Sequence, residues 1–181
     1  MKHRFGLLRV LAACCLSAAV ASAFAAPPSG PCDAPSTTIV IVRHADRAGT
    51  ADSLSAAGVV RAQDLSRVLA SANITRIYHS DTHRTRDTAA PLAAALGLEP
   101  LEYPANDVAA LIERIFRDDA GKAVLVVGHS NTAPLLIKAA GGPTLADINE
   151  KEFDDLFIVN VPRCAERPVT LTQLQYGAPS P

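Results

Sequence analysis

The sequence contains no tryptophan, and aromatic residues make up only 4% of its 181 residues. Proteins that hold nucleobases or sugar rings use aromatic side chains as stacking surfaces, so this composition indicates no platform of that kind. A strong charge of one sign is also missing, because the formal net charge is −1. Nucleic acids and anionic membranes attract strongly basic proteins, so the charge indicates neither as a partner.

The sequence also lacks an uninterrupted apolar run long enough for a membrane anchor. Arg9 cuts short the run dominated by Val10 to Ala21, whereas a spanning helix needs roughly 18 or more apolar residues. Basic residues before this run and the small-residue site Ala23-Phe24-Ala25 after it are typical of a cleaved secretory signal. We therefore predict a signal peptide over residues 1–25, export to the periplasm or the medium, and no stable membrane insertion after cleavage.

A lipid anchor is the alternative for this segment, since Leu11 to Cys14 resembles the lipid-attachment box of bacterial lipoproteins. We rank it below cleavage near Ala25 because Arg9 breaks the apolar segment and the residues after Cys14 remain apolar. Cleavage removes three of the 17 basic residues and none of the 18 acidic ones. Because the mature chain is then mildly acidic, an anion site must depend on a local cluster of positive charge.

Cysteine is scarce after cleavage, because Cys14 and Cys15 leave with the signal and only Cys32 and Cys164 remain. In an oxidising compartment, two such residues favour a disulfide. The bond would close most of the domain into one loop, with a stabilisation of about 4 to 5 kcal/mol in the chain-entropy model. Two unrelated buried thiols are the alternative, which a free-thiol assay distinguishes.

One domain follows a proline-rich leader. Four prolines within residues 26–36 prevent regular structure there, so we predict a single domain over residues 37–181. A chain of this length with 49% apolar residues can bury one ordinary core. Continuous apolar runs at Thr37 to Val42 and Ala123 to Val127 are typical of strands that are covered on both faces.

Helical patterns alternate with these strands. Apolar spacing predicts helices from about Ser55, over Arg86 to Leu96, from about Val108, and after His129. Gly97 fits a left-handed C-terminal cap. Three shorter strands are predicted at Ile74 to His79, Phe157 to Val161 and Val169 to Gln175. This alternation predicts an α/β fold, a three-layer α/β/α sandwich with a largely parallel sheet.

Polar residues follow three of the predicted strands, as Arg43-His44, His79-Ser80 and His129-Ser130. In a wound α/β sheet, ligands bind beyond the carboxyl ends of the strands, so these residues are expected to meet. Guanidinium groups of Arg43 and the nearby Arg84 match phosphate oxygens, and imidazole is nucleophilic near neutral pH. The two cations should also keep His44 unprotonated for in-line attack, so the cluster predicts phosphoryl transfer.

Three segments in this order and spacing resemble the histidine phosphatase superfamily, which includes the phosphoglycerate mutases. They are VRHADR (Val42 to Arg47), SDTHRTRDTA (Ser80 to Ala89) and VVGHSNT (Val126 to Thr132), and the stretch from Leu54 to Leu65 matches the helix after the first motif. The resemblance extends from about Thr37 to Gly142. It implies a phosphoglycerate mutase-like fold close to the small phosphohistidine phosphatases, and a hydrolase of the histidine acid phosphatase type. We expect no metal or cofactor, because the histidine spacings match no common zinc pattern.

Carried over residue by residue, the resemblance implies that His44 becomes phosphorylated and that Arg43, Arg84 and His129 bind the phosphoryl group. The usual glycine after the first histidine is Ala45 here. The substrate is then a small-molecule phosphate ester or a surface phosphate, such as a sugar phosphate, a phosphorylated glycan or phosphohistidine on a protein. Mutase activity is disfavoured because the sequence has no long insertion to enclose a bisphosphorylated substrate.

The reaction also needs a general acid that protonates the leaving oxygen, and the sequence determines the position of this residue least. Asp107 lies between the second and third motifs, as in the small phosphohistidine phosphatases, and it is equally suited to cap the helix that begins near Val108. Asp46 is an alternative acid. Arg47 is expected either to contact the phosphate or to pair with an acid such as Asp46.

Two other functions remain open. Gly128-His129-Ser130 after a strand imitates the nucleophile elbow of a serine hydrolase, with Ser130 as nucleophile. Against it, the elbow requires glycine where this chain has Thr132, and no histidine follows His129. A phosphate-binding module without turnover is the second alternative.

Overall fold

The computed structural model describes residues 32–180. In chain order the elements are β1 (Thr37–Arg43), α1 (Ala56–Leu69), β2 (Ile74–Ser80), α2 (His83–Leu96), β3 (Leu101–Tyr103), α3 (Val108–Asp118), β4 (Ala123–Gly128), α4 (Thr132–Ala139), β5 (Asp155–Val161) and β6 (Thr170–Gln175). The predicted signal peptide, the lipid-anchor cysteine and the start of the leader lie outside the described residues. Within residues 32–180, no helix has the length and apolarity that a membrane span requires.

All six strands form one sheet in the order β3-β2-β4-β1-β5-β6. The first four of these are parallel to one another, whereas β5 runs antiparallel to β1 and β6 antiparallel to β5. The largely parallel sheet expected from the sequence is therefore confirmed, with an antiparallel pair at one edge. That pair needs no crossover helix, because antiparallel neighbours can be joined by a loop, here residues 162–169.

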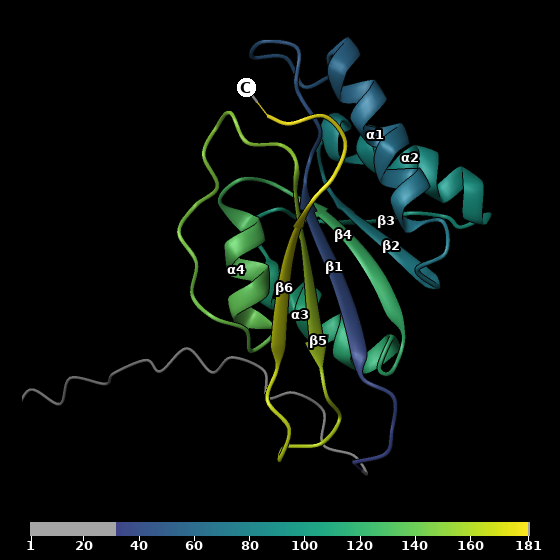
Figure 1. Ribbon diagram of the computed structural model, residues 1–181, viewed down its shortest axis with the longest axis vertical. Coiled ribbons are helices and arrows are strands. Elements are labelled where there is room, and N and C mark those ends of the chain that lie inside the picture. Colours follow the sequence, from purple (N-terminus) through teal and green to yellow (C-terminus); the bar gives the residue numbers. More distant parts are fainter. Residues whose placement is uncertain (1–31, 181) are drawn as a thin grey trace, which may run out of the picture.

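Helices cover both faces of the sheet, which gives the three layers that the sequence predicts (Figure 1). Strand β1 shows why its apolar run does not alternate. Val40 and Val42 pack in the core under α1 and α2, whereas Ile39 and Ile41 pack in the core under α3 and α4. Because both faces are buried in the middle of β1, residues 39–42 are all apolar.

Two helix starts show how local chemistry sets the boundaries. Helix α1 starts close to the predicted position, and Ser55 caps it, because the Ser55 hydroxyl accepts a hydrogen bond from the Gly58 N–H at 3.1 Å. Helix α2 begins one turn before the predicted Arg86, because the Asp52 carboxylate accepts hydrogen bonds from the N–H groups of His83 and Arg84. A carboxylate distant in sequence therefore satisfies the first N–H groups of α2.

Strand β3 is only three residues long and was not predicted from the sequence. It pairs with β2 at the edge of the sheet, with Tyr78 opposite Leu101 and Ser80 opposite Tyr103. So short a strand shows no hydrophobic period that could be recognised. Gly97, by contrast, has the expected left-handed conformation at the end of α2, with a φ of 64°.

Candidate active site

The three polar segments meet because the strands before them are parallel neighbours. Arg43 lies opposite Gly128 across the β1–β4 pair, and His79 lies opposite Val127 across the β2–β4 pair. The strand ends therefore share one edge of the sheet. A pocket of about 420 Å³ opens at this edge and is lined by Arg43, His44, Arg47, Thr82, Arg84, Ala105, Asn106, His129, Ser130, Asn131, Thr132 and Glu150.

His44 lies at the floor of the pocket and is only 3% exposed. Its Nδ1 is 2.8 Å from the carbonyl oxygen of Ala45. Because a carbonyl can only accept, Nδ1 carries the proton and Nε2 keeps its lone pair. Burial, together with the positive charges of Arg43 and Arg84, lowers the pKa of His44 to about 3. The imidazole is therefore neutral near pH 7 and has a nitrogen free to act as a nucleophile.

Arg43 and Arg84 each have an N–H group without a hydrogen-bond partner among the described residues. Arg43 is buried, and its Nη1 donates to the carbonyls of Asn149 and Glu152 at 2.8 and 2.9 Å. Arg84 Nη1 donates to an oxygen of Asp52 at 2.9 Å. Among the described residues, the Nε–H groups of both arginines are buried without a hydrogen-bond partner. Two buried, unpaired guanidinium donors beside one pocket are suited to an anion with several acceptor oxygens.

His129 is fixed by partners at both ring nitrogens. Its Nδ1 is 3.3 Å from Arg84 Nη2, which can only donate, so Nδ1 is the acceptor and Nε2 carries the proton. Nε2 donates to the Ser80 hydroxyl at 2.7 Å, and that hydroxyl is 3.1 Å from the Thr85 hydroxyl. Burial and the charge of Arg84 lower the pKa of His129 to about 4. The His129 and His44 rings are 5.5 Å apart between centroids and meet edge to face.

Arg47 pairs with an acid, as one prediction had it, but this acid is Glu150 and not Asp46. Arg47 lines the pocket, and its Nη2 is 3.4 Å from Glu150 Oε2. Asp46 instead pairs with Arg61 of α1, where Nε and Oδ2 are 2.6 Å apart. Asp46 does not line the pocket that contains His44.

Asp107 caps helix α3, and its carboxylate accepts a hydrogen bond from the Ala110 N–H at 3.2 Å. It lines two neighbouring hollows but not the pocket of His44. Within residues 32–180, Glu150 is the one acidic residue that lines the pocket of His44, and it was not predicted from the sequence. Glu150 lies in the long loop between α4 and β5, outside every motif, so no sequence signal marked it.

Ser130 also lines the pocket, but its hydroxyl donates to Glu150 Oε1 at 2.7 Å. In the described part of the chain, none of the hydrogen bonds of Ser130 involves a histidine. A serine nucleophile needs a base within hydrogen-bond reach, so this geometry gives no support to the serine hydrolase alternative.

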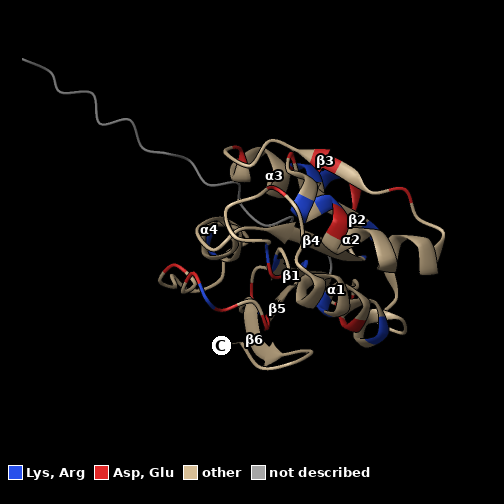
Figure 2. Cartoon of the chain, turned by 90° about the horizontal axis from the view of Figure 1, so that it is seen from above, with Lys and Arg blue, Asp and Glu red and all other residues tan. Residues whose placement is uncertain are grey.

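Positive charge is local rather than general. Basic and acidic residues are interspersed over the elements in Figure 2, in agreement with the small net charge. Three arginines nevertheless line a single pocket. A small anion is therefore attracted at the strand ends and not by the surface as a whole.

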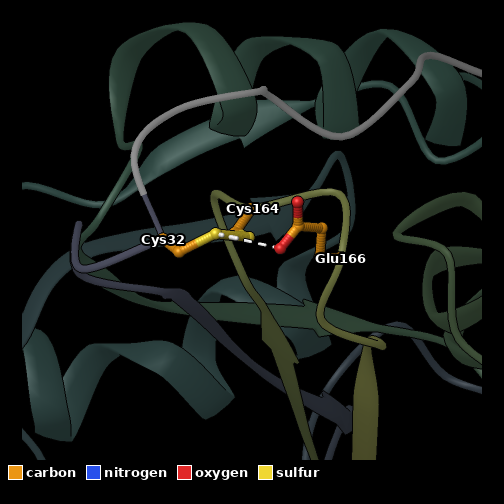
Figure 3. A group of neighbouring side chains, drawn as sticks. All are labelled: Cys32, Cys164 and Glu166. Carbon is orange, nitrogen blue, oxygen red and sulfur yellow. Dashed lines mark hydrogen bonds between the residues drawn. A yellow bond between two sulfur atoms is a disulfide. The ribbon is translucent and has the colours of Figure 1, made fainter.

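The structure contains the predicted disulfide between Cys32 and Cys164. Glu166 lies beside it, and together these three form the one group of metal-type ligands in residues 32–180 (Figure 3). Because the two sulfur atoms are bonded to each other, they offer no thiolate to a metal ion. The two cysteines therefore form a structural crosslink, and Glu166 lies beside it.

Comparison with known proteins agrees with this geometry. The family model "Histidine phosphatase superfamily (branch 1)" matches residues 39–105. No match was found among curated proteins. Among solved structures, the protein histidine phosphatase SixA complexed with tungstate is 18% identical, with a TM-score of 0.61 over 76% of this chain and 96% of that chain.

Two further structures have the same fold. The alpha-ribazole phosphatase from Shigella flexneri is 14% identical, with a TM-score of 0.59 over 76% of this chain and 96% of that one. The phosphoglycerate mutase from Plasmodium falciparum is 19% identical, with a TM-score of 0.55 over 80% of this chain and 95% of that one. The family-model match is limited to residues 39–105, and the similar solved structures show that the chain has a phosphoglycerate mutase-like fold.

Proposed function

We propose that the chain is a phosphomonoester hydrolase that forms a phosphohistidine on His44. The observation that carries the proposal is a neutral, buried imidazole in the same pocket as two arginines whose Nε–H groups have no partner among the described residues. Phosphoryl transfer needs a nucleophile and fixed positive donors around the equatorial oxygens, and this pocket offers both. The similar SixA structure is a tungstate complex, and tungstate is a tetrahedral oxyanion like phosphate.

Each residue has a separate task in this proposal. Arg43 and Arg84 hold the phosphoryl oxygens with charge-assisted hydrogen bonds. The lone pair of His44 Nε2 attacks phosphorus, the bond from phosphorus to the ester oxygen breaks, and the alcohol leaves. Water then attacks the phosphohistidine, releases inorganic phosphate and returns the electron pair to Nε2. His129, which Ser80 and Arg84 hold in place, lines the same pocket and is proposed to contact the transferring group there.

The proposed setting is outside the cytoplasm, because the N-terminal segment has the pattern of a secretory signal. The proposed substrate is a small phosphate ester or a phosphate group on an exposed surface. An open pocket of about 420 Å³ is large enough for a phosphoryl group and part of a leaving group. Arg47 is proposed as a third contact to that substrate.

Hydrolysis of 4-nitrophenyl phosphate by the purified mature protein tests the proposal. We expect turnover by the wild type and loss of at least about 10³-fold in kcat/KM for His44→Ala, because the nucleophile is missing. Rapid quenching without acid should trap a phosphate on His44. Ser130→Ala serves as the control and should keep most of the activity. Full activity of His44→Ala, or an unmodified His44 after quenching during turnover, would contradict the proposal.

A further inference from the structure

The carboxylate of Glu150 lines the pocket, and Arg43 holds the turn that carries it. The carbonyl groups of Asn149 and Glu152, on either side of Glu150, both accept hydrogen bonds from Arg43 Nη1. The same guanidinium reaches the Glu150 carboxylate itself, with 3.1 Å between Nη2 and Oε2. A residue of the proposed phosphate site therefore positions both the backbone and the side chain of this turn.

The rest of the loop is anchored to the pocket as well. The Ile148 N–H donates to the Ser130 carbonyl at 3.0 Å. Phe153 is buried, with its ring centroid 4.1 Å from Arg43 Cζ and 5.9 Å from the His44 ring. Contacts with Ser130, Arg43 and His44 therefore hold the segment around Glu150 in place at the pocket.

The side chain of Glu150 is placed on the open side of the pocket. It is 64% exposed, whereas His44 at the floor is 3% exposed. In-line displacement puts the leaving oxygen on the side of phosphorus away from the nucleophile. Attack from the floor therefore directs the leaving oxygen toward the mouth, where Glu150 is the one acidic residue among the pocket-lining residues.

We propose that Glu150 is the general acid of the reaction, and this inference rests on the proposed function. As His44 Nε2 bonds to phosphorus, the ester P–O bond breaks and its electron pair remains on the leaving oxygen, which takes a proton from the Glu150 carboxyl group. In the second half, the Glu150 carboxylate accepts a proton from water as the water oxygen bonds to phosphorus. The P–N bond then breaks, its electron pair returns to His44, and inorganic phosphate leaves.

A general acid must be protonated before it reacts, and substrate binding favours protonation of Glu150. The hydrogen bond from Ser130 and the charges of Arg43 and Arg47 hold the pKa of Glu150 below its ordinary value. A bound phosphomonoester draws these arginines to its own oxygens and brings negative charge next to the carboxylate. Both changes raise the pKa of Glu150, because two adjacent anions favour protonation of one of them.

The dependence of kcat/KM on the leaving group distinguishes a general acid from a carboxylate with another role. Aryl phosphates with a nitro group need little protonation of the leaving oxygen, whereas alkyl phosphates need much. For Glu150→Gln we expect kcat/KM on glycerol 1-phosphate to fall by about 10²-fold or more, and on 4-nitrophenyl phosphate by only a few-fold. The retained activity on the second substrate also shows that the variant folds. The basic limb of the kcat profile with glycerol 1-phosphate should disappear as well.

Glu152→Gln is the matched control, since it removes the same charge from the same turn without lining the pocket. It should leave both substrates unaffected. Asp107→Asn tests the alternative acid directly. Selective loss on glycerol 1-phosphate in Asp107→Asn, but not in Glu150→Gln, would overturn the assignment.

In the opposite case, Glu150 only competes with the phosphate for Arg43 and Arg47. In that case Glu150→Gln would raise kcat/KM on both substrates equally and bind inorganic phosphate more tightly, which overturns the proposal. A wild-type protein inert toward both substrates, or an active His44→Ala, refutes the proposed function and with it this inference. A wild-type protein that turns over both, with Glu150→Gln equally active on each, refutes the role of Glu150 alone.

Discussion

His44 and His129 are neutral for the same physical reason. Each ring is buried, and removal from water disfavours the protonated form more than the neighbouring arginine charges do. In His44 one ring nitrogen has a partner, the Ala45 carbonyl, whereas both ring nitrogens of His129 have partners, the Ser80 hydroxyl and Arg84. The pocket thus has cationic donors only on the arginines, which leaves the imidazole of His44 free for bond formation.

The acid limb of the pH profile reports on this burial. Protonation would block His44 as the proposed nucleophile, and its pKa of about 3 lies below the value of 6.5 for free histidine. As pH falls from about 7.5 to about 5, kcat/KM for 4-nitrophenyl phosphate should therefore show no loss from His44, once substrate ionisation is corrected for. Inactivation should begin only when pH approaches the lowered pKa values. Half-loss near pH 6.5 would show instead that the His44 ring is solvated.

At the scale of elements, helix α1 is fastened to the loop after β1 by one buried guanidinium. Arg61 donates to Asp46 at 2.6 Å and to the carbonyls of Tyr176 and Ala178 at 3.1 and 2.7 Å. Gly58 of α1 allows this approach, because an added Cβ would lie 2.1 Å from the Asp46 carbonyl oxygen. The loop that carries His44 is thereby joined to α1 and to the C-terminal segment.

Arg61→Lys tests the forked geometry of this connection. A lysine keeps the charge but cannot donate in several directions from one plane, so buried acceptors lose partners. We expect a loss of about 2 kcal/mol or more in the free energy of unfolding, measured by urea denaturation. Arg67→Lys on the same helix is the control, since Arg67 is 79% exposed and pairs with Asp64. It should change stability by less than about 0.5 kcal/mol. Equal effects in the two variants would contradict the prediction.

The elements differ in how far the sequence predicts them. Strands β1 and β4 are evident because their burial on both faces produces continuous apolar runs, and the stripe of α3 produces a clear helical period. The catalytic candidates His44 and His129 follow from these strands directly. Glu150 does not, because its place is set by hydrogen bonds from Arg43, more than 100 residues earlier in the chain. The same applies to Asp52, whose carboxylate caps α2 from a distant loop.

At the scale of the whole molecule, the site and the crosslink occupy opposite ends of the sheet. Arg43 is the last residue of β1 and His44 follows it, whereas Cys32 precedes Thr37, which pairs with Val161 at the end of β5. Six residue steps along a strand correspond to about 20 Å. The crosslink therefore restrains the chain without contacting the pocket.

Loss of the crosslink should lower stability and leave catalysis intact. The disulfide joins residues 132 positions apart, so in the chain-entropy model it restricts the unfolded chain by about 4 to 5 kcal/mol. We expect a double Cys32→Ala and Cys164→Ala variant to show a clearly lower Tm and an unchanged kcat/KM at 25 °C. A reductant should lower the Tm of the wild type but not of the variant. Two reactive thiols in the folded, unreduced protein would contradict the crosslink, and a fall in kcat/KM at temperatures where the variant is fully folded would show that the two ends of the sheet are coupled.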